Sequence, residues 1–353
     1  MNYTELYKKD LIKAQISCID YRLLQGANIL ITGAGGLVCS SLVDYLLCIN
    51  DSFGLNMSVY AAVRNVEKAE KRFARLLHRQ DLRIIEYDAL KHIEWDAEAD
   101  YIIHGASPAF PKLYIQQPAE TMKVNLIGTI NILEYAKTHH IKAVVFLSSS
   151  EIYGKNSLSK QRLSKQYSEA DYGFVDLLQP RSCYPSAKRA CETLCISYLE
   201  EYGVCSMIVR PGHVFGPTAA RADNRISSSF FYDTIEGQNI VLKSSGTQLR
   251  SYCYAPDCAS AIITVLTKGK AGEAYNIANP SSNISIREFS EILARIAGRK
   301  VIFENPEAAE QRAFNAMDNA CLDPEKLLHL GWAPQFDAET GIRHTYCIMK
   351  NEC

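Results

Sequence analysis

Short apolar runs alternate with longer amphipathic stretches from residue 27 to about residue 210. The runs are apolar at nearly every position, which predicts strands buried on both faces, as in a parallel sheet covered by helices. The predicted strands are 28–32, 57–63, 82–87, 101–104, 143–147 and 205–210, and the predicted helices between them are 37–49, 66–77, 118–139 and 182–202. This order predicts βαβ units with right-handed crossovers, and therefore an α/β fold with a Rossmann-type, doubly wound parallel sheet.

The rhythm changes near residue 211, where Pro211-Gly212 and Gly216-Pro217 mark turns. Beyond this point the pattern predicts helices over 225–237, 255–267 and 286–297, and strands over 239–243 and 274–278. We therefore expect three parts, which are a helical extension over 1–26, a dinucleotide-binding Rossmann domain over 27–211, and a smaller, mixed α/β substrate-binding lobe over 212–353. Part of this lobe should return to the sheet. No Gly/Ser or Pro-rich linker separates the lobes, so they should pack tightly.

The composition is that of an ordinary globular protein, with 47% hydrophobic and 22% charged residues among 353 and a net charge of −1. So small a net charge creates no global field for nucleic acid or an anionic membrane. The N-terminus lacks the apolar core of a signal peptide, and no window approaches the length of a membrane span. The 12 cysteines form no Cys-x-x-Cys pair. We therefore expect free, mostly buried thiols, no metal site, and a soluble, cytoplasmic protein.

A glycine-rich turn follows the first predicted strand and opens the first predicted helix, as a dinucleotide site requires. The segment reads Thr32-Gly33-Ala34-Gly35-Gly36-Leu37-Val38-Cys39-Ser40. Gly33 can adopt the dihedral angles of the tight turn, and Gly36, without a Cβ, lets the backbone approach a pyrophosphate. The helix N-terminus offers free N–H groups and a positive dipole end to the same anion. We therefore predict cofactor contacts from Gly33, Gly35, Gly36, Leu37 and Val38.

The residue after the second strand bears on the choice between NAD and NADP. An NAD site usually places an acid there to bind the ribose 2′-hydroxyl, whereas this chain has Arg64. A cation suits a 2′-phosphate, although a solvated surface arginine is the competing interpretation, so both cofactors stay open. Asp88, followed by Ala89, comes after the third strand and can accept a hydrogen bond from the adenine amino group or cap a turn.

Tyr184 and Lys188 lie four residues apart, so they share one face of their predicted helix. Oxidation of an alcohol needs a base that takes the hydroxyl proton as hydride leaves the same carbon. Free tyrosine has a pKa of about 10, and a neighbouring ammonium together with a positive nicotinamide ring favours the phenolate. Lys188 can also hold the nicotinamide ribose. Ser149, after the strand 143–147, can hydrogen-bond the substrate oxygen and assist proton transfer.

Together these segments resemble the extended short-chain dehydrogenase/reductase family, which includes nucleotide-sugar epimerases, dehydratases and decarboxylases. The resemblance covers roughly residues 27–345. It is carried by Thr32 to Gly36, His104 to Pro108, Asn125 to Thr129, Ser149 to Gly154, Tyr184 to Lys188, Arg210 to Pro217, and Arg250 to Asp257. It implies an NAD(P)-dependent, homodimeric enzyme with Tyr184 as base, Lys188 as its partner and Ser149 as third member of the triad. It further implies cofactor contacts from Ala106 and Asn125, and substrate contacts from Ser107, Arg225 and Arg250, the two arginines clamping the diphosphate.

The groups beside Ser149 bear on the reaction that follows a first oxidation at the sugar C4. Where 4,6-dehydratases carry Asp-Glu, this chain has Ser150-Glu151, so the proton donor for dehydration is missing. Ser149-Ser150-Glu151 and Pro180 to Tyr184 resemble UDP-glucuronate decarboxylases, which implies Glu151 as a catalytic group and Ser150 at the substrate. Those enzymes carry asparagine where this chain has His213, and a histidine there can contact a different C5 or C6 substituent. A 4-epimerase, a 4,6-dehydratase, a 4-ketoreductase and a non-catalytic dinucleotide-binding sensor or scaffold stay open as alternatives. In the redox-neutral reactions the cofactor stays tightly bound and is recycled.

Overall fold

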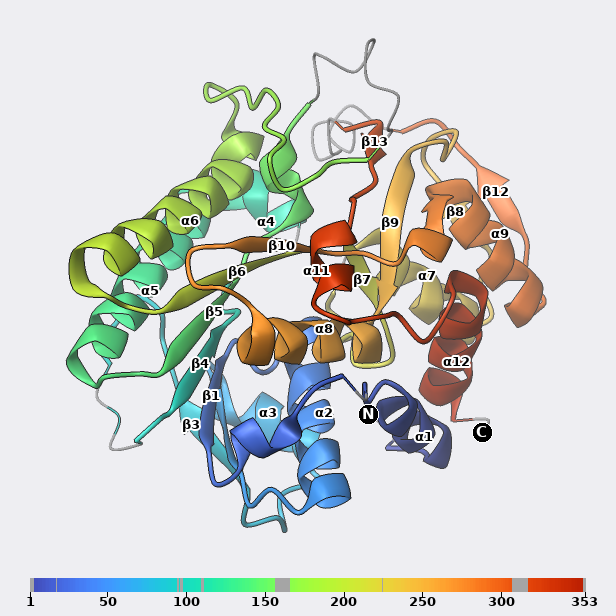
Figure 1. Ribbon diagram of the computed structural model, residues 1–353. Helices are drawn as coiled ribbons and strands as arrows, with labels where there is room; N and C mark the ends of the chain where they lie inside the picture. Colours follow the sequence, from blue (N-terminus) through green and yellow to red (C-terminus); the bar gives the residue numbers. More distant parts are fainter. Residues whose placement is uncertain are drawn as a thin grey trace.

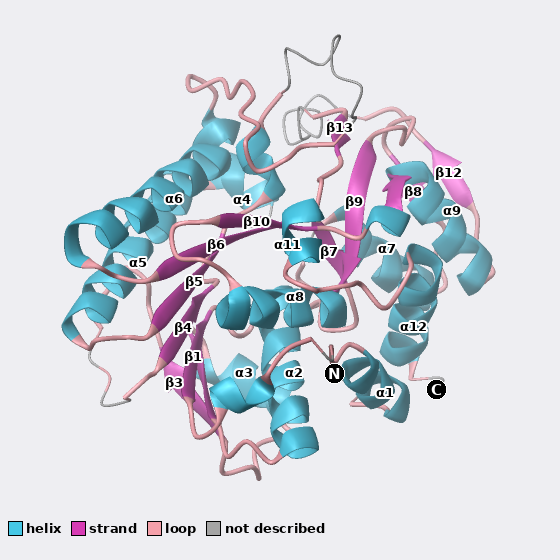
Figure 2. Ribbon diagram, viewed as in Figure 1, coloured by secondary structure: helices cyan, strands magenta, loops and turns pink. Residues whose placement is uncertain are grey.

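The computed structural model describes residues 3–16, 18–93, 95, 98–108, 111–155, 166–223, 225–306 and 317–351. Within these residues seven strands form one sheet in the order β10-β6-β5-β4-β1-β2-β3, and every pairing is parallel (Figures 1 and 2). The strands are β1 Asn28–Thr32, β2 Ser58–Val63, β3 Leu82–Glu86, β4 Tyr101–His104, β5 Ala143–Leu147, β6 Ser206–Pro211 and β10 Ala274–Ile277. The predicted α/β fold is confirmed, and β1, β4 and β5 have the predicted bounds.

Helices cover both faces of this sheet (Figure 1). One face carries α2 Leu37–Phe53, α3 Val66–Phe73 and α8 Ala255–Lys268, and the other carries α5 Pro118–Thr138 and α6 Cys183–Tyr202. Successive side chains of a strand point to opposite faces, so β1 sends Ile29 and Ile31 into one apolar core and Leu30 into the other. This burial on both faces explains why the strands read as continuous apolar runs.

The strand order reverses between β1 and β4, which are neighbours in the sheet. The chain leaves β1 towards β2 and β3 on one side and later returns to β4 on the other. Ligands of open α/β sheets bind beside such a reversal, outside the carboxyl ends of the strands. Thr32 and His104, the last residues of β1 and β4, therefore lie where a dinucleotide is expected.

Most of the chain beyond residue 211 forms a second lobe of short strands and helices, at the right of Figures 1 and 2. Among the described residues, β9 pairs with β7, β11 and β13, and β8 pairs with β12. The strands are β7 His213–Phe215, β8 Ile240–Leu242, β9 Leu249–Tyr254, β11 Asn283–Ser285, β12 Val301–Phe303 and β13 Asn319–Ala320. The helices are α7 Ile226–Ile235, α9 Ile286–Ala297, α11 Glu325–His329 and α12 Ala338–Lys350. In space, α8 and β10 lie with the main sheet although they follow residue 211.

The N-terminal extension forms a shorter helix than predicted, α1 Glu5–Lys13, followed by a single 3₁₀ turn at Tyr21–Leu24. Thr4 caps α1 by accepting a hydrogen bond from the N–H of Tyr7, and Asp20 starts the 3₁₀ turn in the same way. The helix packs between α2 and α12, so the two ends of the chain lie close together (Figure 1). Asp10 is buried there and accepts hydrogen bonds from the Tyr254 hydroxyl at 2.8 Å and from His344 Nδ1 at 2.9 Å.

The described cysteines are all free thiols, and most of them are buried. In the described part of the chain no group of three or more His, Cys, Asp or Glu side chains is placed to hold a metal ion. No helix within the same residues has the length and apolar character needed to cross a bilayer.

Candidate active site

A large cavity lies between the carboxyl edge of the sheet and the second lobe, with a volume of about 2120 Å³. Its lining brings together residues from β1, β2, β4 and β5, from α6, and from the second lobe. It includes every residue that the sequence predicts for the site except Asn125. These are Gly33, Gly35, Gly36, Leu37, Val38, Arg64, Asp88, Ala89, Ala106, Ser107, Ser149, Ser150, Glu151, Tyr184, Lys188, His213, Arg225 and Arg250.

Asn125 is the exception. It is buried within α5, where its Nδ2 donates a hydrogen bond to the Thr121 carbonyl oxygen at 2.7 Å, and it does not line the cavity. The structure thus gives no support for a cofactor contact from its side chain, and that contact stays a prediction from the resemblance. Its backbone oxygen accepts a hydrogen bond from the Cys191 thiol, at 3.3 Å, so Asn125 ties α5 to α6 instead.

The glycine turn has the geometry of an anion cradle. Gly33 has a φ of +71°, and a Cβ there would lie 2.8 Å from the backbone oxygen of Gly105, so only glycine fits. Gly36 is the N-cap of α2 and provides no side chain to bond its first N–H groups. These N–H groups and the positive end of a 17-residue helix therefore face the cavity without a partner from the cap.

The end of β4 is held against this turn by Thr32. The Thr32 hydroxyl oxygen accepts hydrogen bonds from the N–H groups of Gly105 and Ala106, both at 3.2 Å, and contacts His104 Nδ1 at 2.7 Å. Burial lowers the pKa of His104 to about 3, so its ring is neutral. The backbone of residues 105–106 is thereby fixed beside Gly33, which gives one wall of the cavity its shape.

The other end of the cavity, beside β2 and β3, fits an adenosine. Val63, Ala89 and Leu90 provide apolar surface, and Asp88 uses one carboxylate oxygen to accept the Leu90 N–H at 3.1 Å, which leaves the other for a ligand. Three features match a dinucleotide. They are a helix N-terminus without a capping side chain, a glycine turn whose space a Cβ would fill, and an apolar slot with a carboxylate at its edge. The residues present therefore fit NAD or NADP.

Tyr184 lies in the first turn of α6 and is buried against Tyr114, which belongs to α4 Pro111–Gln116. The two rings are stacked, with centroids 4.5 Å apart and planes inclined by 10°. Burial, with a smaller contribution from Glu151, raises the pKa of Tyr184 to about 12, although hydrogen bonds with Ser149 and Tyr114 act in the opposite direction. The site therefore places two hydroxyls beside the phenol that must lose a proton.

Lys188, one helical turn after Tyr184, is also buried. Its Nζ donates a hydrogen bond to the Leu147 carbonyl oxygen at 2.7 Å and lies 5.9 Å from the centre of the Tyr184 ring. Burial lowers the pKa of Lys188 to about 8, so the ammonium persists at neutral pH although burial disfavours its charge. The charges of Glu151 and Arg225 act on the pKa of Tyr184, and stabilisation of its phenolate by Lys188 stays a prediction from the sequence.

Glu151 follows Ser149 and Ser150 in a 3₁₀ turn, Ser150–Tyr153, whose N-cap is Ser149. Arg181 binds both oxygens of its carboxylate, at 2.9 and 3.0 Å. The Arg181 guanidinium also lies 4.8 Å from the centre of the Tyr114 ring. Arg181, Glu151, Tyr114 and Tyr184 thus form one connected group, so that the charge of Glu151 is balanced beside the reactive phenol.

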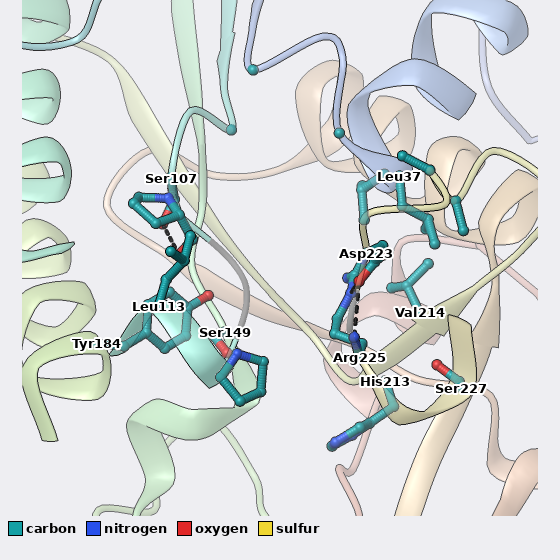
Figure 3. Close-up of a pocket in the computed structure, with 18 of the residues that line it drawn as sticks. Leu37, Ser107, Leu113, Ser149, Tyr184, His213, Val214, Asp223, Arg225 and Ser227 are labelled. Atoms are coloured by element: carbon teal, nitrogen blue, oxygen red, sulfur yellow. Dashed lines mark hydrogen bonds and ion pairs between the residues drawn. The ribbon is translucent and has the colours of Figure 1, made fainter. Parts of the chain in front are cut away.

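The second lobe supplies the opposite wall, where Figure 3 shows His213 and Arg225 facing Tyr184 and Ser149 across the cavity. Asp223, which is buried, forms an ion pair with Arg225, and Arg225 Nε donates to it at 3.0 Å. Burial, together with the charges of Arg250 and Arg225, lowers the pKa of His213 to about 3, so its imidazole is neutral. Its Nδ1 is buried without a hydrogen-bond partner among the described residues, which leaves it free to bind a ligand.

Three site residues were not predicted from the sequence, namely Tyr114, Arg181 and Asp223. Arg181 stands three residues before Tyr184, at the start of the same helical segment, so its spacing was a usable signal. Tyr114 reaches Tyr184 only because α4 packs on the 3₁₀ turn Pro180–Ser182, a contact that no local pattern predicts. Asp223 immediately precedes a position outside the described residues, and its ion pair with Arg225 depends on the folded loop.

Fold and cavity together define a Rossmann-type, dinucleotide-dependent enzyme, with a buried tyrosine and a buried lysine lining the cavity. The chain matches the NAD dependent epimerase/dehydratase family over residues 29–278 and belongs to that family. It is 30% identical over 328 residues to UDP-glucuronic acid decarboxylase 1 of Xenopus tropicalis, covering 92% of this chain and 72% of the relative. It is 28% identical to UDP-glucuronic acid decarboxylase 6 of Arabidopsis thaliana, covering 89% of this chain and 86% of the relative.

Solved structures agree with this assignment at the level of the fold. UDP-glucuronic acid 4-epimerase from Bacillus cereus, in complex with UDP-glucuronic acid and NAD, matches with a TM-score of 0.77 at 21% identity. The match covers 92% of this chain and 99% of that chain. The family predicted from the sequence motifs is therefore confirmed, and the chain is a nicotinamide-dinucleotide-dependent enzyme of the epimerase/dehydratase type.

Proposed function

We propose that this enzyme decarboxylates a nucleotide-linked uronic acid, of the UDP-glucuronate type, through a transient ketone at C4. The relatives described above bear the name UDP-glucuronic acid decarboxylase and align with most of the chain. The structural observation that carries the proposal is the Ser149-Ser150-Glu151 turn with its carboxylate held by Arg181. This arrangement offers the oxidising triad but no free acid beside it.

Oxidation at C4 requires removal of a hydroxyl proton and a hydride from one carbon. Tyr184 takes the proton, Ser149 hydrogen-bonds the same oxygen, and the Lys188 ammonium stabilises the phenolate. When bound, NAD supplies the hydride acceptor for this step and the hydride donor that restores C4. Because Tyr184 and Lys188 are both buried, water is largely kept from the proton transfer.

The C4 ketone then makes the C6 carboxylate a leaving group, because the sugar has become a β-keto acid. The C5–C6 bond breaks, CO₂ leaves, and its electron pair forms an enolate across C5, C4 and the ketone oxygen. A proton enters at C5, and reduction of C4 returns a proton from Tyr184 to the hydroxyl. The chain needs to stabilise the enolate oxygen only, and the Ser149 and Tyr184 hydroxyls, which both line the cavity, would donate hydrogen bonds to it.

The charges around the site support an anionic sugar. Arg181, Arg225 and Arg250 line the cavity together with Lys188. Among the described lining residues of this region, the carboxylates of Glu151 and Asp223 are already engaged by Arg181 and Arg225. A nucleotide sugar with a diphosphate and a carboxylate would therefore enter a region of surplus positive charge.

Dehydration fits this site less well. Elimination of a C6 hydroxyl requires a proton donor next to Ser149, and Ser150 is a buried hydroxyl that cannot act as an acid at neutral pH. Both carboxylate oxygens of Glu151 accept hydrogen bonds from Arg181, so neither is free to contact a C6 hydroxyl. Epimerisation at C4 would need only the triad and room for the ketone to turn over, so it is the competing outcome of the experiment below.

The proposal is tested by incubating the enzyme with a panel of nucleotide sugars that includes UDP-glucuronate and reading the product masses. Loss of about 44 Da supports decarboxylation, whereas loss of about 18 Da, gain of about 2 Da or an isomer of unchanged mass would indicate dehydration, reduction or epimerisation instead. Tyr184→Phe should abolish turnover. The matched control is Tyr202→Phe, at an exposed tyrosine of the same helix, which should keep it.

We also propose that the enzyme works as a homodimer through α5 and α6. Both helices lie on the outer face of the sheet, and α5 exposes Met122, Ile127 and Ile130 there. Ile130 and Leu194, from the two helices, line one shallow apolar groove on this face. Sedimentation analysis of the wild type and of Ile130→Lys would test the dimer. Cytoplasmic location stays a prediction from the sequence.

A further inference from the structure

Three cations line the adenosine end of the cavity. Arg64 follows β2 directly, and Lys68 and Arg72 lie in α3, so the three positions are spaced by four residues. Lys68 and Arg72, spaced by four, share one face of α3, where like charges repel each other. An anion bound among them would remove this repulsion. The same face lines the part of the cavity that also contains Val63 and Asp88, beside the adenine slot.

No carboxylate of the described residues neutralises Arg64 or Lys68 through an ion pair. Glu67 pairs with Lys71 at 2.6 Å, and both are well exposed. The end of β2, where an acid would accept the 2′-hydroxyl of an NAD ribose, carries Arg64 in its place. The positive charge is therefore available at the point where NAD and NADP differ.

Arg72 is held in place by an ion pair with a buried carboxylate. Its Nη2 lies 2.6 Å from Asp44 Oδ2, and Asp44 is fully buried in α2. The Tyr7 hydroxyl of α1 donates to the same oxygen at 3.0 Å. Arg72 Nε is buried and has no hydrogen-bond partner among the described residues, so the side chain is held in place with donor capacity unused.

From these observations we propose that the enzyme recognises a 2′-phosphate through Arg64, Lys68 and Arg72, and so binds NADP in preference to NAD. The N-terminal helix α1, which precedes the family match at residues 29–278, takes part by holding Arg72 through Tyr7 and Asp44. The inference rests on the proposed function only in requiring a dinucleotide in this cavity. It assigns one role, recognition of the 2′-phosphate, to the three cations and to the N-terminal helix.

Calorimetric titration of nucleotide-stripped enzyme with NADP⁺ and with NAD⁺ tests the proposal without any sugar substrate. NADP⁺ should bind about 10-fold more tightly or better, because a charge-assisted contact to phosphate is worth roughly a factor of ten. Arg64→Ala and Lys68→Ala should each weaken NADP⁺ about 5-fold to 10-fold while changing NAD⁺ affinity less than about twofold. Lys71→Ala, at the exposed lysine paired with Glu67, is the matched control and should change neither affinity.

The anchoring role of α1 has its own readout. Tyr7→Phe removes one hydroxyl and keeps the packed ring, so the protein should fold, and we expect NADP⁺ affinity to fall several-fold with NAD⁺ affinity unchanged. Equal or tighter binding of NAD⁺ by the wild type, or an equal loss for both nucleotides in Arg64→Ala, would overturn the 2′-phosphate assignment and leave the proposed function standing. Binding of neither nucleotide would overturn both.

The nucleotide that accompanies the purified enzyme gives an independent measurement. Denaturing the protein and weighing the released dinucleotide should yield NADP or NADPH, about 80 Da heavier than the NAD forms. Release of NAD alone from the wild type would count against the inference. Arg64→Asp, which restores an acid after β2, should then shift the released nucleotide towards NAD.

Discussion

Replacing Lys188 by methionine should stabilise the folded protein at neutral pH while abolishing turnover. The ammonium is buried, and its pKa is lowered by burial to about 8 from an ordinary value of 10.5. At roughly 1.4 kcal/mol per pKa unit, keeping the charge inside therefore costs about 3 kcal/mol. Methionine removes this charge but leaves the Leu147 carbonyl oxygen without a side-chain donor, which costs about 1 kcal/mol. The net gain in the free energy of unfolding is about 2 kcal/mol.

The gain should depend on pH in a defined direction. Between about pH 8 and pH 10.5 the unfolded chain holds a proton on Lys188 that the folded protein has lost, so wild-type stability rises with pH there. Below pH 8 the buried ammonium lowers the free energy of unfolding by its full amount, and above pH 10.5 this destabilisation is gone. The advantage of Lys188→Met should therefore be largest near neutral pH and should disappear, or change sign, in the alkaline limit.

Denaturant unfolding of nucleotide-stripped protein at about pH 7 and about pH 10 measures both effects. In a thermal unfolding experiment at neutral pH, we expect the melting temperature of the variant to be about 3 °C higher than that of the wild type. Lys142→Met is the matched control, because Lys142 is largely exposed and pairs with Asp100 at 2.7 Å. Its stability should change by less than about 0.5 kcal/mol. A Lys188→Met protein that is no more stable than the wild type at neutral pH, or whose difference is independent of pH, would refute the reasoning.

Three further predictions concern the cavity. Gly33→Ala should abolish dinucleotide binding measured by calorimetry, because its Cβ would lie 2.8 Å from a backbone oxygen. The control is Gly54→Ala, at a glycine with a similar φ of +61° and no neighbour within 4 Å. This control should lose about 1 kcal/mol of stability and still bind the dinucleotide. Arg181→Lys cannot bind Glu151 through two parallel bonds, so kcat should fall about 10-fold with dinucleotide affinity unchanged, and full activity would contradict the role given to this pair. The pKa of His213 lies near 3, so kcat should show no histidine ionisation between about pH 5 and pH 8, and a limb near pH 6.5 that vanishes in His213→Gln would disprove its neutral state.

The main sheet could be predicted closely from the sequence, because its strands are buried on both faces and bounded by turns. β1, β4 and β5 have the predicted bounds for this reason. The extension over 1–26 was predicted as one helix but ends at Lys13, since a local helical pattern does not show where a chain turns to pack. β9 was not predicted at all, because Arg250 and Ser251 interrupt its apolar pattern. Both are buried by partners far along the chain, and Ser251 Oγ donates to Asn283 at 2.5 Å.

The site was predictable where its residues follow strand ends or share a helix face. Ser149, Tyr184 and Lys188 are of this kind, and all three line the cavity. The Tyr114 stack required the docking of α4, which no periodicity encodes. Asn125 was assigned to the cofactor because its motif lies near the site, but the side chain turns into its own helix. A motif therefore predicts which segments lie near the site. The folded backbone decides which of their side chains point into the cavity.

The chemistry at C4 can be tested most directly with UDP-glucuronate that carries deuterium at C4. If the bound dinucleotide takes the C4 hydrogen as hydride and returns the same atom, the decarboxylated product should keep its deuterium at C4, and turnover should be slower than with the unlabelled sugar. A product that has exchanged this deuterium for solvent hydrogen, or CO₂ release at full rate from Tyr184→Phe, would contradict the transient ketone on which the proposed function depends.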